Sequence, residues 1–185
     1  SDTNIPSGES LIRQVVWGKR WFLKELNTDS RVAWMPDTFG FSAALPQILK
    51  KCRVPYFATQ KLARQDPEAE PFPYHFFWWE GLDGSRILAH NYKKNNAVFC
   101  SGELIARWED DRVQTENIEG MLFPYGYGDG GGGPTRDMAE QARRCLDLEG
   151  APRCRLESPQ AFFDRQHAVK NVYKGELYLA WHRGT

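Results

Sequence analysis

The sequence predicts an α/β fold in which strands alternate with helices around one core. Three observations lead to this prediction. The 185 residues suit a single domain of ordinary size. Hydrophobic residues make up 41% of the chain and aromatic residues 14%, which is enough for a sizeable core. Short apolar runs typical of strands are separated by segments whose apolar residues recur at helical spacing.

The first third of the chain is expected to supply two helices and two strands. Residues 7–26 predict a helix, because Ser7 can cap its start and apolar residues fall near one face. Residues 31–35 form a short apolar strand that a proline ends. A second helix follows from about residue 43, and residues 54–59 form the next strand. The apolar stripe of that second helix comprises Leu45, Ile48, Leu49 and Cys52.

The remaining residues continue the alternation after a polar loop with several prolines at 64–73. The next two strands are joined by a glycine-flanked turn at 81–84. We expect further strands at residues 75–79, 87–92, 121–125, 153–156 and 175–179. We expect further helices at residues 100–118, 134–148 and 159–167.

Charge and cysteine spacing limit the classes of function. The 24 Lys and Arg residues balance 24 Asp and Glu residues, whereas nucleic-acid binders usually carry a basic excess, so no nucleic-acid partner is expected. No apolar run approaches the roughly 18 residues of a membrane helix, so no membrane partner is expected either. The four cysteines are too scattered for a zinc knuckle or a disulfide framework. They predict reduced thiols in a cytoplasmic protein.

A carboxylate follows the first predicted strand. Pro36 ends that strand, Asp37 comes next, and Gly40 permits a sharp turn into the following helix. Loops at the carboxyl ends of strands carry the sites of α/β proteins. Asp37 is therefore a candidate nucleophile, base or metal ligand. The plainer interpretation is a turn or capping residue.

A glycine-rich loop supplies the second candidate. Gly126, Gly128 and Gly131 match the G-x-G-x-x-G pattern between a strand and a helix, and Glu149 lies near the expected ribose-binding position. This pattern leaves open a nucleotide-binding α/β oxidoreductase. Asp129 lies inside the loop, where its charge would oppose a pyrophosphate. The small residues can instead let a ligand approach Asp129 closely, or the loop can be a plain surface loop.

Two carboxylates at two strand ends fit glycoside hydrolysis, which needs an acid near the leaving oxygen and a carboxylate near the anomeric carbon. Aromatic side chains near both loops suit sugar stacking, although core packing is the alternative for each. These aromatic residues are Trp34, Phe39, Trp78, Trp79, Tyr125 and Tyr127.

Six stretches of the chain resemble the zinc-dependent α-mannosidases of glycoside hydrolase family 38, and most closely the cytosolic type and its bacterial relatives. They are DTNIPSGESL at 2–11, WMPDTFGFSAALPQI at 34–48, YFATQK at 56–61, FWWEGLDGSR at 77–86, YGYGDGGGGPT at 125–135 and GELYL at 175–179. They follow the family's order across nearly the whole chain. The resemblance implies that residues 1–185 are an internal fragment of one catalytic domain, a partial seven-stranded (β/α) barrel.

The resemblance also implies a glycoside hydrolase of mannose metabolism that removes terminal α-linked mannose from oligosaccharides with retention. Asp37 matches the residue that is both nucleophile and zinc ligand in the family, and Asp129 lies in the acid/base region. Phe39 and Lys61 match positions that line the mannose pocket. The expected substrate contacts are Phe39, Lys61, Trp79 and Tyr127.

The chain departs from the family in its histidines. The family's His-x-Asp pair and its later histidine, which complete the zinc site, have no counterpart among His75, His90, His167 and His182. We therefore expect the remaining Zn²⁺ ligands, the first-strand metal motif and the downstream domains to lie outside this chain, and residues 1–185 alone to be inactive. A homo-oligomer of the full-length protein fits this reading. The alternative is a non-catalytic carbohydrate-binding remnant.

Overall fold

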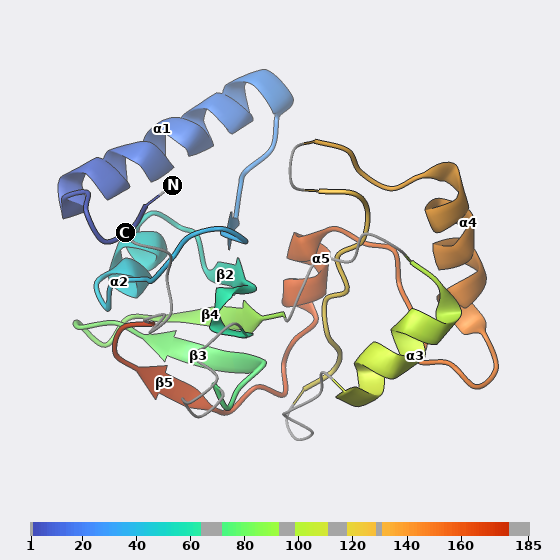
Figure 1. Cartoon of the computed structure of the whole chain (residues 1–185). Coiled ribbons are helices and arrows are strands. Elements are labelled where there is room, and N and C mark those ends of the chain that lie inside the picture. Colours follow the sequence, from blue (N-terminus) through green and yellow to red (C-terminus); the bar gives the residue numbers. More distant parts are fainter. Residues whose placement is uncertain (1, 64–71, 93–98, 111–117, 129–130, 178–185) are drawn as a thin grey trace.

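A five-stranded mixed sheet forms the centre of the computed structural model (Figure 1), which describes residues 2–63, 72–92, 99–110, 118–128 and 131–177. The strands are β1 (Val32–Trp34), β2 (Tyr56–Thr59), β3 (Phe76–Glu80), β4 (Arg86–Asn91) and β5 (Val172–Lys174), in the order β1-β2-β4-β3-β5. β1, β2 and β4 are parallel, whereas β3 is antiparallel to β4 and parallel to β5. The sheet confirms the α/β class, and the seven-stranded barrel stays a prediction.

The helices begin close to where the sequence places them. They are α1 (Gly8–Leu26), α2 (Leu45–Lys51), α3 (Ser101–Asp110), α4 (Arg136–Arg144) and α5 (Pro159–Asp164), with 3₁₀ turns at Lys61–Ala63 and Cys145–Asp147. Ser7 caps α1 as predicted, since its hydroxyl oxygen accepts from the Ser10 N–H at 3.3 Å. In α2 the predicted stripe is buried at Leu45, Ile48 and Leu49. Among the described residues, no helix is both long and apolar enough to cross a bilayer.

Three apolar clusters hold these elements together. The first joins α2 to one face of the sheet through side chains such as Leu49, Phe57 and Ile87. The second packs α5 onto Leu88 and neighbouring residues with Phe162 and Phe163. The third joins α3 to α4, which lie side by side away from the sheet (Figure 1). Alternate residues of β4 belong to the first two clusters, so the central strands are covered on both faces.

Two predicted strands do not form. Residues 121–124 are irregular and Tyr125 forms a single bridge, because the Leu122 N–H donates to His90 Nε2 at 3.1 Å instead of to a neighbouring strand. Residues 153–156 are also irregular and largely exposed, so no neighbouring strand pairs with them. β5 lies at 172–174, before the strand predicted at 175–179. Within that predicted range Leu177 forms an isolated antiparallel bridge with Phe41, and residues 178–179 lie outside the described residues. The predicted helix at 100–118 is described only to residue 110.

Candidate active site

The Asp37 loop leaves the sheet at the carboxyl end of β1. The Met35 N–H donates to the Ala58 carbonyl at 2.8 Å, which extends the pairing with β2 by one residue before Pro36 ends it. Asp37 then points outward, with 72% of its side chain exposed. The sequence prediction that Asp37 lies at the carboxyl edge of the sheet therefore agrees with the structure.

The start of the chain fixes this loop, which sequence reasoning did not identify. The Thr3 hydroxyl donates to the Gly40 carbonyl at 2.8 Å, and the Asn4 side-chain amide donates to the Phe39 carbonyl at 3.2 Å. Gly40 has a φ of 91°, and a Cβ there would lie 2.7 Å from Asn4 Nδ2. Glycine is therefore required by both its backbone conformation and its close neighbour.

Lys61 meets Asp37 from the end of the neighbouring strand β2. Its side chain is 6% exposed, and its ammonium forms an ion pair with Asp37 Oδ1. The same ammonium lies 4.5 Å from the centroid of the Phe39 ring, within the range of a cation–π contact. The cost of burying a charged group is offset when it has such partners. The structure therefore brings together three predicted site residues, which we call the Asp37 cluster (Asp37, Phe39 and Lys61).

The other predicted substrate contacts lie elsewhere. Trp79 is completely buried, packs against Phe57 and Phe41, and donates from Nε1 to the Gly175 carbonyl at 2.8 Å. No face of its ring is open to a sugar, so its position is that of a core residue. Tyr127 is 52% exposed on the glycine loop, and its N–H donates to the Gly133 carbonyl at 3.0 Å. Asp129 lies outside the described residues.

Two polar residues at the end of β4 were missed from the sequence. Asn91 and Tyr92 are 4% and 2% exposed, and within the described ranges Asn91 Oδ1 and the Tyr92 hydroxyl are the two buried side-chain polar atoms without a hydrogen-bond partner. The Tyr92 ring stacks on Trp34, with centroids 5.1 Å apart and planes 17° apart. Their position at the carboxyl end of an apolar strand is the signal that could have found them, since Asp37 was also identified by its position at a strand end.

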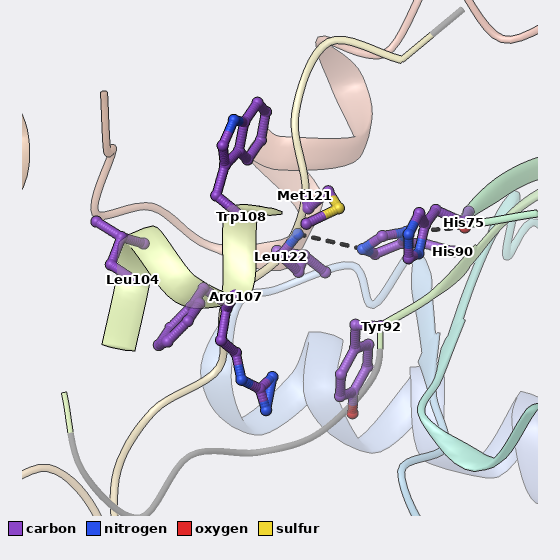
Figure 2. Close-up of a pocket in the computed structure, with 9 residues that line it drawn as sticks. His75, His90, Tyr92, Leu104, Arg107, Trp108, Met121 and Leu122 are labelled. Carbon is purple, nitrogen blue, oxygen red and sulfur yellow. Dashed lines mark hydrogen bonds between the residues drawn. The ribbon is translucent and has the colours of Figure 1, made fainter. Parts of the chain in front are cut away.

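A small cavity of about 40 Å³ lies beside Tyr92 and two histidines (Figure 2). His90 accepts from the Leu122 N–H at Nε2, and its Nδ1 lies 2.9 Å from the His75 carbonyl oxygen, to which it donates. Burial lowers the pKa of His90 to about 3. His90 is thus a neutral residue whose two ring nitrogens are both satisfied, which leaves neither free to bind a metal.

The described residues do not by themselves suit a zinc ion. Within the ranges given above, no three side chains of His, Cys, Asp or Glu lie close enough together to hold one. Protein zinc sites normally take at least three such ligands. The ion-pair partner of Asp37 is the Lys61 ammonium, which is a cation and cannot be a ligand.

Sequence and structure comparisons connect this chain to one family. The description "Glycosyl hydrolases family 38 N-terminal domain" matches residues 1–183. Alpha-mannosidase 2C1 of Mus musculus is 40% identical over 191 residues, which cover all of this chain and 18% of the relative. Alpha-mannosidase G of Dictyostelium discoideum is 40% identical over 189 residues and is covered to 17%. The chain thus spans less than one fifth of these relatives.

A solved structure shows the same fold. The crystal structure of an alpha-mannosidase from Enterococcus faecalis V583 superposes on 95% of this chain with a TM-score of 0.70, at 19% sequence identity. The match covers 21% of that structure. At this level of identity the likeness supports the arrangement of the elements and nothing about individual side chains.

Proposed function

The chain belongs to family 38 of the glycosyl hydrolases, and from this premise we propose that it is part of an enzyme that removes terminal α-linked mannose from oligosaccharides. The observation that carries the proposal is the Asp37 cluster. It combines an exposed carboxylate, a buried cation and an aromatic ring at the carboxyl edge of a sheet. This is the edge where α/β enzymes carry their chemistry.

Asp37 is the proposed nucleophile of a retaining mechanism. One of its carboxylate oxygens bonds to the anomeric carbon while the bond from that carbon to the leaving oxygen breaks. Asp129 is the proposed acid and gives its proton to the leaving oxygen. Water then attacks the anomeric carbon of the covalent glycosyl-enzyme, Asp129 takes back a proton, and Asp37 is released. The exposure of Asp37 supports this role, because a nucleophile has to be reachable by the substrate.

The two other members of the cluster position the nucleophile and the sugar. Lys61 is buried and ion-paired with Asp37, so it limits the directions that the carboxylate can take. Phe39 is 38% exposed, which leaves part of its ring free for a sugar face. Tyr127 is exposed on the glycine loop and is a proposed further contact.

Zinc belongs to the proposal through the family resemblance. Asp37 would be one ligand, with the remaining ligands outside this chain. A bound zinc ion supplies Lewis-acid and template chemistry to sugar hydroxyls.

The family match favours neither the nucleotide-binding oxidoreductase nor the carbohydrate-binding remnant. A cytoplasmic location is also proposed, from the resemblance to the cytosolic type, and agrees with four cysteines that are free thiols. A homo-oligomer of the full-length protein stays a prediction.

The test uses the full-length protein and an aryl α-mannoside. We expect release of mannose that proton NMR first detects as the α-anomer, loss of turnover on chelation, and recovery on adding Zn²⁺. The matching aryl β-mannoside is the control for the anomer. Residues 1–185 alone should be inactive. A full-length protein that binds NADH and leaves α-mannosides intact would overturn the proposal in favour of the nucleotide-binding alternative.

A further inference from the structure

The two polar atoms at the end of β4 stand out because native proteins rarely bury such atoms without partners. Most buried side-chain polar atoms accept or donate a hydrogen bond, and each exception calls for an explanation. Asn91 Oδ1 and the Tyr92 hydroxyl are such exceptions in the part of the chain that the structure describes. They belong to consecutive residues at the end of one strand, so their side chains leave the strand on opposite faces of the same edge of the sheet.

That location is the same edge of the sheet as the Asp37 cluster. β4 runs parallel to β2, with Asn91 opposite Thr59, and the Tyr92 N–H donates to the Thr59 carbonyl at 2.9 Å. Lys61 follows Thr59 by two residues and donates its N–H to the Thr59 hydroxyl oxygen at 3.2 Å. The ends of β2 and β4 thus place the backbone of Asn91 and Tyr92 beside the chain segment that leads to Lys61.

Tyr92 is also linked to the Asp37 loop through aromatic stacking. Its ring lies against Trp34, the last residue of β1, and Asp37 follows three positions later in the chain. Trp34 is 38% exposed and lines a cleft of about 720 Å³. Figure 2 shows the hydroxyl end of Tyr92 directed away from His75 and His90, so the histidine pair does not use it.

The chemistry of the pair suits a neutral polyol. An amide oxygen accepts a hydrogen bond, whereas a phenol donates one, and each sugar hydroxyl can do both. Burial raises the pKa of Tyr92, so its hydroxyl keeps the proton that it would donate. Neither group carries charge, and therefore neither would attract an ion to this side of the edge.

We propose that Asn91 and Tyr92 are substrate-binding residues whose free acceptor and free donor bind hydroxyl groups of the mannoside held at the Asp37 cluster. The proposal rests on the proposed function. Because the two side chains leave the end of the strand on opposite faces, each would meet a different hydroxyl of the mannoside. The two atoms then lack partners because the substrate that they would bind is absent. Their hydrogen bonds to the sugar would provide specificity, whereas Asp37 provides reactivity.

The test is Tyr92→Phe in the full-length protein, since phenylalanine keeps the stack on Trp34 and removes only the hydroxyl. We expect kcat/KM for an aryl α-mannoside to fall about tenfold, as for one lost hydrogen bond to substrate, with no loss of thermal stability. Asn91→Leu, of nearly equal size, should give a similar fall. The matched control is Tyr56→Phe, whose ring also stacks on an aromatic residue and whose hydroxyl already has a protein partner, Asp164. Its kinetics should stay unchanged.

A series of monodeoxy aryl α-mannosides separates contact from indirect effects. One deoxy substrate should lose about tenfold with wild type and nothing further with Tyr92→Phe, because the two changes delete the same hydrogen bond. Equal kinetics of wild type, Tyr92→Phe and Asn91→Leu, with mannosidase activity present, would overturn this inference and leave the proposed function standing. A wild type that neither hydrolyses α-mannosides nor binds free mannose in a calorimetric titration would overturn both.

Discussion

The amino and carboxyl ends of the parallel strands carry similar residues. The two ends differ in how far the polar groups of these residues are hydrogen-bonded or ion-paired. At the amino end, the Tyr56 hydroxyl donates to Asp164 Oδ1 at 2.6 Å, and Arg31 donates to the same oxygen at 3.4 Å. The Tyr56 ring stacks on Phe163 with centroids 4.9 Å apart. A carboxylate, a cation, a tyrosine and a second aromatic ring thus satisfy one another.

The carboxyl end holds the same four kinds of side chain, but they do not satisfy one another in this way. Asp37 pairs with Lys61 but keeps 72% of its side chain exposed. Tyr92 stacks on Trp34, yet its hydroxyl lacks a partner within the described ranges. The comparison teaches that residue types alone do not mark a site. What marks it is hydrogen-bonding capacity that the fold leaves unused.

The largest expected difference between the two ends comes from their carboxylates. Asp37→Asn in the full-length protein removes the proposed nucleophile, so kcat for an aryl α-mannoside should fall by about 10⁴-fold. Asp164→Asn is the matched control and should leave kcat within about twofold, since surface substitutions away from a site act mainly on stability. Steady-state kinetics of the two purified variants would measure this. Similar kinetics for both would remove Asp37 from its role.

The fold could be predicted in large part from the sequence, because local signals and burial agree in most elements. The Ser7 cap and the apolar stripe of α2 are predicted from residues that are close together in the chain, and both are confirmed. The strand expected at 121–125 failed because Leu122 bonds to a histidine 32 positions away in the chain. The sequence pattern records that residues 121–125 are apolar, but it does not record which long-range partner takes the N–H.

The second largest difference between the two ends is expected from substitution of their cations, Lys61 and Arg31. Lys61→Met removes the group that holds Asp37, so kcat/KM should fall about tenfold to a hundredfold because the carboxylate loses its orientation. Thermal stability should hold or rise, because methionine avoids the cost of burying an ammonium that is 6% exposed. Arg31→Met, at a guanidinium that is 36% exposed, should leave kcat/KM unchanged. Loss of stability without loss of activity in Lys61→Met would assign Lys61 a purely structural role.

The site was less predictable than the fold, for a related reason. Asp37 was identified as a polar residue just after a strand and Lys61 through the family resemblance, and the structure places the two side chains together. Trp79 follows the same pattern of aromatic residues near a loop, but its side chain points into the core of the sheet. Asn91 and Tyr92 were passed over because an unsatisfied hydrogen bond is a property of the folded neighbourhood, which no single residue type reveals.

Between the two ends, the buried His90 should make stability depend on pH. Its pKa in the folded state is about 3, below the ordinary value of 6.5, because burial disfavours the charged ring. The unfolded chain therefore binds a proton that the folded chain does not, and stability falls as the pH drops below 6.5, by about 1.4 kcal/mol per unit. Urea unfolding between pH 7 and 5 would measure it. His90→Gln, which can still donate to His75 and accept from Leu122, should flatten the dependence. An unchanged slope would place its origin in other groups.

The smallest expected effect concerns the two tyrosine hydroxyls and gives the most direct test of the comparison. Tyr56→Phe deletes a made hydrogen bond and leaves Asp164 with one partner fewer, so the free energy of unfolding should fall by about 1 kcal/mol. Tyr92→Phe deletes a hydroxyl that has no partner, so the free energy of unfolding should stay the same or rise, because burying an unpaired hydroxyl is costly. Chemical denaturation of both variants beside wild type would show whether the signs differ. If Tyr92→Phe lost as much stability as Tyr56→Phe, the Tyr92 hydroxyl would have a partner in the folded protein, and the two ends of the sheet would be alike.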